Sequence, residues 1–157
     1  MDRTKSTYGL GFKVSATDEQ MAKFIKEHSR AVMNCNEGSD TASGKNILDW
    51  MESGCSGSIC EKFYDYESEV TGRTGLYGLI ADVMTKETGL RFGYHRTDTP
   101  CDKPEYIVFP GIKACEMNAE ERDLTEDELR KILEAYIKDF DGQTVIEDVI
   151  LGREYCD

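Results

Sequence analysis

The sequence predicts an α+β fold, and three observations predict it. A strand pattern near the N-terminus is followed by a helical pattern, two further strand patterns follow one another in the second half, and a clear helix then leads into a last strand. This order is β-α-β-β-α-β, the order of a ferredoxin-like sheet. A chain of 157 residues is typical of one domain, so a single α+β domain over residues 1–157 is expected.

The first strand is predicted by alternation from Tyr8 to Val14. Gly9 and Gly11 share one face of it, which indicates close approach by another backbone or a helix. Thr17 and Gln20 then have the spacing of a capping box, and apolar residues at helical spacing continue to residue 32. His28 lies on or beside this apolar stripe, and we interpret it as a partly buried histidine at a helix end.

The polar stretch 34–45 predicts a loop, and it includes a near match to a nucleotide-binding phosphate loop. The interval from Gly38 to Gly44-Lys45 is one residue too long for that motif. Asn46 stands where a serine or threonine should bind magnesium. We therefore predict no nucleotide site here.

Residues 46–88 predict a helical insertion between the first helix and the second strand. Its helical patterns cover 46–52, 59–70 and 76–86, with glycine-rich breaks between them. A section of this size is too small to hold a core by itself. It is therefore expected to belong to the same domain as the sheet.

Two strands are predicted at 91–96 and 105–109, joined by a connection rich in proline and aspartate that indicates a hairpin. The helix over 124–140 is the clearest element of the chain. Thr125 and Glu128 are spaced as a capping box, and apolar residues then recur three and four positions apart. The apolar run from 145 to 151 predicts the last strand, at a sheet edge beside the first.

Six cysteines occur without a secretory signal sequence, and no apolar run approaches the length of a membrane-spanning helix. We therefore expect thiols rather than disulfides, a cytoplasmic location and no membrane contact. A zinc site built from Cys55, Cys60, Cys101 and His95 is a minor alternative, because the cysteine spacing does not match common zinc motifs. No metal and no cofactor are predicted.

The net charge of −12 argues against direct nucleic-acid binding, which depends on patches of lysine and arginine. The charge is uneven, because residues 116–157 hold 14 acids and 5 bases. Part of this excess belongs to the first turn of the helix over 124–140, where the helix dipole favours anions, and part to i,i+4 pairs. Acids without such local neutralisation are the predicted partner-binding residues: Glu116, Glu120, Glu121, Asp123, Asp139, Asp141, Glu147, Asp148 and Glu154.

We therefore expect an acidic, non-enzymatic binding protein that engages a basic partner protein and imitates the phosphate charge of a nucleic acid. Small, strongly acidic proteins without motifs are common among phage anti-defence inhibitors, which act against CRISPR or restriction systems. An acidic surface that is merely solvated, with no special partner, is the alternative for the same charges.

The second hypothesis is a small cytoplasmic enzyme. Its site would be centred on His95, with a cysteine or a carboxylate, in a pocket between the sheet and the helical insertion. Nothing in the sequence marks a group as activated, so no catalytic residue is assigned. A homodimer formed through the last strand is compatible with either hypothesis.

Overall fold

The computed structural model describes residues 4–54, 57–96, 105–138, 140 and 145–155. Within them the chain forms four strands, seven α-helices and one short 3-10 helix. In chain order they are β1 (Thr4–Lys13), α1 (Asp18–Glu27), α2 (Ser29–Met33), α3 (Gly44–Glu52), α4 (Ile59–Lys62), α5 (Tyr77–Thr88), β2 (Gly93–Arg96), β3 (Glu105–Phe109), η1 (Ala114–Glu116), α6 (Ala119–Asp123), α7 (Glu126–Ile137) and β4 (Ile146–Tyr155).

The four strands form one antiparallel sheet in the order β2-β3-β1-β4. The fold is therefore α+β, as expected from the sequence. β2 pairs with β3, and β4 lies at the edge beside β1, which confirms both predicted pairings. The close backbone approach predicted at the glycines of β1 is found at Gly11, where an added Cβ would lie 2.2 Å from the carbonyl oxygen of Ile107 in β3.

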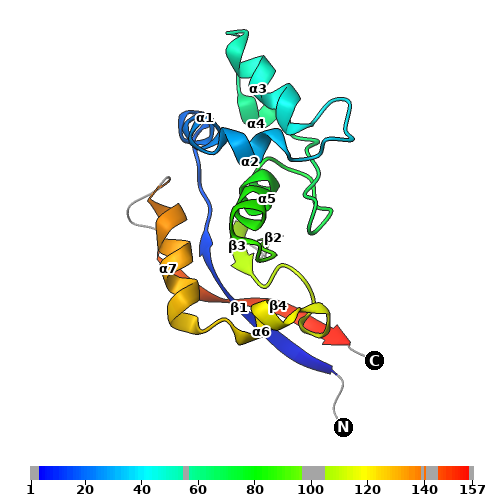
Figure 1. Ribbon diagram of the computed structural model, residues 1–157, viewed down its shortest axis with the longest axis vertical. Helices are drawn as coiled ribbons and strands as arrows, with labels where there is room; N and C mark the ends of the chain where they lie inside the picture. The colour runs from blue at the N-terminus through cyan, green and yellow to red at the C-terminus, as the bar shows by residue number, and fades with distance from the viewer. Residues whose placement is uncertain (1–3, 55–56, 97–104, 139, 141–144, 156–157) are drawn as a thin grey trace, which may run out of the picture.

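Two helices cover the sheet, and α1–α4 gather at one end of the molecule, whereas α6 lies away from them beside β1 and β4 (Figure 1). α5 contacts β2 and β3, whereas α7 contacts β1 and β4. α5 is the last helix of the section 46–88, and every residue from Gly78 to Met84 in it is buried. A helix that is apolar on most of its circumference must be covered on several sides. This explains why α5, rather than the amphipathic α1, lies against the sheet.

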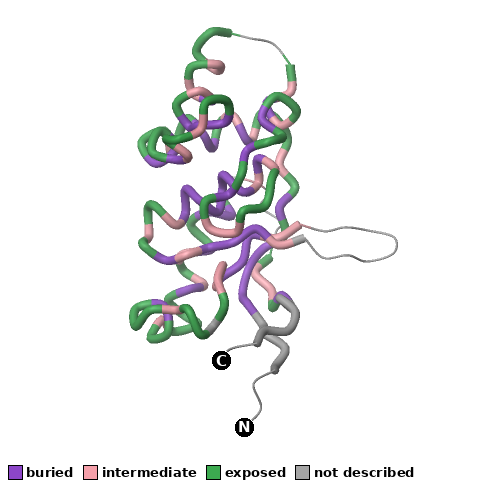
Figure 2. The backbone as a smooth tube through the Cα atoms, turned by 90° about the vertical axis from the view of Figure 1, so that its right-hand side faces the viewer, coloured by how far each residue is buried: buried purple, intermediate pink, exposed green. Residues whose placement is uncertain are grey.

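Buried residues run continuously from the sheet through α5 into the helices at the far end (Figure 2). Phe24 of α1 lies between His28 and Phe140, with ring centroids 4.4 and 5.3 Å apart. Phe140 in turn stacks at 6.3 Å on Phe12 of β1. This row of rings joins the end of α7 to α1 and the sheet.

The helix predicted over 59–70 is wrong beyond Lys62, and a buried carboxylate explains the difference. Asp82 of α5 is 1% exposed and accepts hydrogen bonds from the Tyr66 hydroxyl at 2.5 Å, the Ser68 hydroxyl at 2.9 Å and the Glu69 backbone N–H at 2.9 Å. A buried carboxylate requires such donors. They hold residues 66–69 in a turn against α5, where a continued helix could not place all three.

The capping predictions hold with one modification. Thr17 and Gln20 form the full capping box of α1. At α7, the Thr125 hydroxyl accepts from the Glu128 backbone N–H at 3.2 Å, as predicted. The Glu128 carboxylate, however, accepts from the Thr125 hydroxyl instead of the Thr125 backbone N–H. The helix itself covers 126–137, which is shorter than the predicted 124–140.

Gly44, the second glycine of the sequence that nearly matches a phosphate loop, has a packing role. Gly44 begins α3 directly against α2, and an added Cβ would lie 1.5 Å from the backbone oxygen of Val32. The Gly44 N–H donates to the Cys35 carbonyl at 2.8 Å. The space around Gly44 is thus filled by the chain's own backbone.

The expectation of thiols holds for Cys35 and Cys60, which are free. It is wrong for Cys115, which is disulfide-bonded. Burial raises the pKa of the Cys35 thiol to about 12, and burial together with Asp18 raises that of Cys60 to about 11. Neither is an activated nucleophile.

None of the helices in the described part of the chain combines the length and the apolar character needed to span a membrane.

Candidate functional site

The acids predicted to bind a partner lie on different elements of the structure. Glu116, Glu120 and Asp123 are exposed on η1 and α6, and Asp148 is exposed on β4. Glu147 is half-buried. Asp139 and Asp141 lie outside the described residues, and the side chain of Glu154 is likewise not described.

The exposed acids from η1 to the first turn of α7 follow one another closely, and we call them the acidic segment. Its members are Glu116, Glu120, Asp123, Glu126, Asp127 and Glu128. Among the described residues, the only ion pair made by this segment joins Glu126 to Arg130, at 3.6 Å. Most of its carboxylates therefore form no ion pair with the bases that the structure describes.

Glu121 differs from the other predicted contact residues, because it is buried. Its side chain accepts from Arg91 Nη2 at 2.5 Å and from Arg91 Nε at 3.1 Å. It is only 2% exposed. The partner-binding role predicted for Glu121 is therefore corrected to a structural one: its carboxylate is occupied by Arg91 and faces the interior.

Backbone groups complete the surroundings of Glu121. The N–H groups of Arg91 and Asn118 both donate to its carboxylate, at 3.0 Å. The Arg91 side chain and these N–H groups hold the pKa of Glu121 at about 2. Arg91 also donates to the Glu116 carbonyl at 3.1 Å, so it joins η1 and α6 to the chain just before β2.

A sequence signal for Glu121 was present and overlooked. Asn118 and Glu121 are three residues apart, the spacing of a capping box, and the structure forms both of its hydrogen bonds. Glu121 was counted with its acidic neighbours because composition alone does not distinguish a capping carboxylate from a solvated one.

Glu147 and Asp148 cannot both belong to one flat contact surface. They pair with Gly11 and Leu10 of β1, and successive strand residues point to opposite faces of a sheet. The acids of β4 are therefore separated from one another, in contrast to the acidic segment.

His28 takes the partly buried role expected from its place at the end of α1. Its Nδ1 lies 2.9 Å from the Glu87 carboxylate, which also accepts from the Tyr136 hydroxyl at 2.7 Å. The imidazole ring lies between the rings of Phe24 and Tyr136. His28 thus links α1, α5 and α7.

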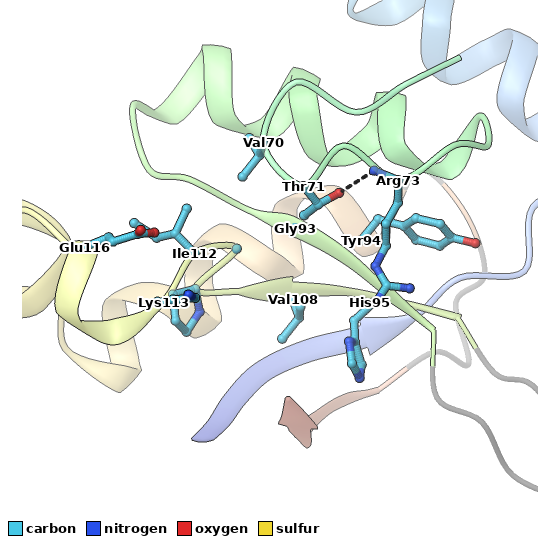
Figure 3. Close-up of a pocket in the computed structure, with 12 residues that line it drawn as sticks. Val70, Thr71, Arg73, Gly93, Tyr94, His95, Val108, Ile112, Lys113 and Glu116 are labelled. Carbon is cyan, nitrogen blue, oxygen red and sulfur yellow. Dashed lines mark hydrogen bonds between the residues drawn. The ribbon is translucent and has the colours of Figure 1, made fainter. Parts of the chain in front are cut away.

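His95 lies in a hollow of about 310 Å³ beside the edge strand β2 (Figure 3). One wall is the loop 70–73, which belongs to the section 46–88, and another is the segment 110–116 that follows β3. The structure therefore places His95 between the sheet and the helical section, where the enzyme hypothesis puts it.

The charged side chains of this hollow come from two parts of the chain, the loop 70–73 and the segment 110–116. Arg73 extends from the loop toward His95, and Lys113 and Glu116 lie at the other end (Figure 3). Neither Cys35 nor Cys60 lines it. The chemistry available from the described side chains is thus an imidazole, two cations and one carboxylate.

No family model, no curated protein and no solved structure matches the chain. Function is therefore inferred from the charges and shapes of these two sites. Among the described residues, no group of three or more histidine, cysteine or acidic side chains is arranged to hold a metal ion.

Proposed function

We propose that this protein is a non-enzymatic binding protein that engages a basic partner protein through its acidic segment. The observation that carries this proposal is the exposure of six closely spaced carboxylates, of which Glu126 alone has an ion-pair partner among the described residues.

Physical considerations favour a basic protein as the partner. Opposite charge accelerates association and selects against wrong partners, and its effect is largest where a surface carries one sign of charge. A row of carboxylates resembles a row of phosphates in charge. We therefore propose that the segment occupies a groove lined by lysine and arginine, as a phage inhibitor of CRISPR or restriction enzymes would do.

The proposed surface differs from the one expected from the sequence, because it adds Glu126, Asp127 and Glu128 at the start of α7 and omits others. Glu121 is excluded by its burial, and Glu147 and Asp148 point to opposite faces of the sheet. The proposed contact is therefore η1, α6 and the start of α7.

The test compares two fourfold variants with the same change in net charge. In one, Glu116, Glu120, Asp123 and Asp127 of the acidic segment become Gln or Asn. In the matched control, four exposed acids around α3 are changed in the same way: Glu37, Asp40, Asp49 and Glu52. Each protein is used to retain partners from a lysate of its source cell, at low and high salt.

We expect wild type and control to retain the same basic protein, and the segment variant to bind it about tenfold more weakly, since exposed charges each contribute a few tenths of a kcal/mol. High salt should release it. Inhibition of the retained protein's nucleic-acid binding would support charge imitation. Equal retention by both variants, or retention of no basic protein, would contradict the proposal.

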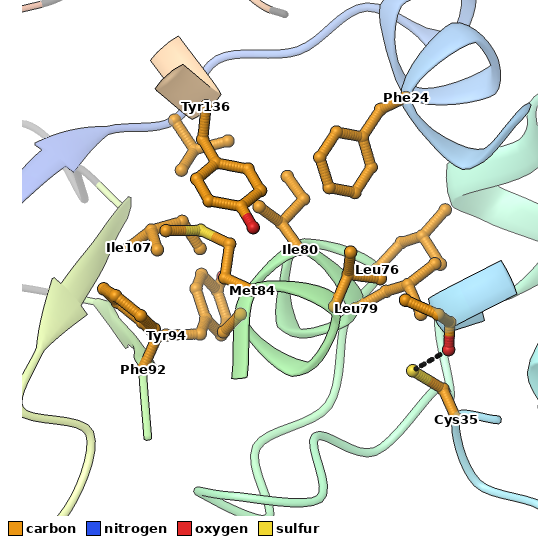
Figure 4. Close-up of a cluster of buried hydrophobic side chains, with 14 of the residues drawn as sticks. Phe24, Cys35, Leu76, Leu79, Ile80, Met84, Phe92, Tyr94, Ile107 and Tyr136 are labelled. Carbon is orange, nitrogen blue, oxygen red and sulfur yellow. Dashed lines mark hydrogen bonds between the residues drawn. The ribbon is translucent and has the colours of Figure 1, made fainter. Parts of the chain in front are cut away.

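We also propose that the sheet layer is ferredoxin-like. The antiparallel order β2-β3-β1-β4 supports this, with one covering helix, α5 or α7, in each half of the chain. Figure 4 supports it further, because side chains of α5 and α7 meet beside Ile107 of β3. On this interpretation, α1–α4 are additions to the ferredoxin-like sheet and its two covering helices.

A small enzyme centred on His95 is the second candidate, and the hollow around His95 is the observation that favours it. A positioned histidine that transfers protons contributes about 10²- to 10⁴-fold to a rate. We expect turnover of p-nitrophenyl esters that falls at least about hundredfold in His95→Gln and persists in His28→Gln. Absence of turnover, or an equal loss in both variants, would exclude this candidate for ester substrates.

A further inference from the structure

A cationic hollow is unexpected in a chain with a net charge of −12. Arg73 of the loop 70–73 and Lys113 of the segment after β3 nevertheless line the same hollow as His95 of β2. We propose that this hollow binds a small phosphate-bearing molecule.

The size of the hollow suits such a ligand. Its volume of about 310 Å³ is at the lower end of the range for small-molecule sites. Tyr94, Val108 and Ile112 supply an apolar part of the lining. A ligand with one charged end and a flat or apolar remainder, such as a nucleoside monophosphate, matches this combination.

The charges favour a phosphate at one end. Among the described residues, neither the Arg73 guanidinium nor the Lys113 ammonium group forms an ion pair. Both are exposed, so an anion can reach them. The Arg73 guanidinium can bind phosphate oxygens through two parallel hydrogen bonds at its end of the hollow, whereas Lys113, at the opposite end, adds a longer-range attraction to the anion (Figure 3).

Two glycines shape the hollow between these cations. Gly93 begins β2, and an added Cβ there would lie 2.8 Å from Gly111 Cα and 3.1 Å from Thr71 Cγ2. The backbones of β2 and the segment 110–116 therefore lie in direct contact. The absence of side chains at both positions lets the two backbone segments pack together and form this part of the lining.

The acidity of the rest of the protein does not prevent this binding. At physiological ionic strength the Debye length is about 8 Å, so exposed acids farther away than this are largely screened. Glu116 is the one carboxylate among the lining residues. It lies near Lys113 at one end of the hollow, while Arg73 and His95 lie at the other (Figure 3).

This inference is independent of the acidic segment. It deepens the second candidate function, because it names phosphate esters as the class of ligand, but it concerns binding and needs no turnover. A binding assay can therefore succeed where p-nitrophenyl ester turnover fails, and the two failures are distinguishable.

The experiment follows backbone amide NMR signals of the full chain during titration with AMP, inorganic phosphate and acetate at constant ionic strength. We expect saturable shifts at Gly93 and Gly111 with AMP, with a dissociation constant below about 10 mM. Saturation by inorganic phosphate as well would show that the phosphate group alone is recognised. Equal saturation by acetate would overturn the preference for phosphate.

Variants locate the site. Arg73→Gln combined with Lys113→Gln should weaken AMP binding at least about tenfold. The matched control, Lys45→Gln with Lys62→Gln, removes two exposed lysines outside the hollow and should bind as wild type does. The amide spectra confirm that each variant is folded. No saturable shift with AMP, or equal weakening by both double variants, would overturn the proposal.

Discussion

Replacement of Glu121 by alanine is expected to lower the free energy of unfolding by about 2 kcal/mol, because it removes a buried carboxylate and leaves its hydrogen-bond donors without an acceptor. The Glu121 carboxylate accepts four hydrogen bonds, two from the Arg91 side chain and two from backbone N–H groups. All four donors lose their acceptor together. Urea denaturation at pH 7 measures the effect.

The neighbouring acid provides the control. Glu120 lies on the same short helix and is exposed, so Glu120→Ala should change the stability by less than about 0.5 kcal/mol. Similar losses in the two variants would contradict the structural role of Glu121. Such a result would instead indicate that Glu121 is solvent-exposed, as Glu120 is.

The stability difference between wild type and Glu121→Ala is also expected to depend on pH. The pKa of Glu121 is about 2 in the folded protein against an ordinary value of 4.5, so the folded state holds fewer protons. Acidification therefore favours unfolding. The stability difference between wild type and Glu121→Ala should be constant above about pH 5 and should shrink as the pH falls from 4.5 toward 2. A difference independent of pH over this range would contradict the ion pair.

Replacement of Gly44 by alanine is expected to destabilise the protein by about 3 kcal/mol, although alanine is the better helix former by about 1 kcal/mol. The added Cβ would lie 1.5 Å from the Val32 carbonyl oxygen and 2.5 Å from the carbonyl carbon. Both are backbone atoms, so no side-chain rotation relieves the clash. α2 and α3 must separate.

Gly38 is the matched control for this prediction. It lies in the loop that precedes α3, and an added Cβ there meets nothing within 4 Å. Gly38→Ala should leave stability unchanged or raise it by a few tenths of a kcal/mol through the unfolded chain. Thermal unfolding measures both variants. An unchanged or higher Tm in Gly44→Ala would show that α3 does not begin against Val32.

Local patterns predicted most elements correctly. The capping box at Thr17 and the apolar spacing that follows it predict α1, and strict alternation predicts β1. The helix predicted over 59–70 was wrong beyond residue 62. The spacing of Phe63 and Tyr66 fits a helix, but it also fits buried positions in a turn. The informative signal was Asp82, a carboxylate within the apolar helix α5 that required donors from elsewhere.

The candidate sites were harder to predict than the elements. Exposed acids could be listed from sequence, but burial of Glu121 depends on Arg91, 30 residues away in the chain. The hollow beside β2 was expected only as a pocket around His95. Arg73 and Lys113 were not singled out, because each is one basic residue among the 19 of the chain.

By itself the sequence determined the order of the strands and main helices, the N-caps of α1 and α7 and the acidic character of the last third. These depend on residues within a few positions of one another, and such interactions act before the chain is compact. Only the tertiary structure decided which helix covers the sheet, which carboxylates face solvent and which cations share a hollow. Those outcomes depend on contacts between residues far apart in the chain, where burial determines whether a charge is paired or exposed.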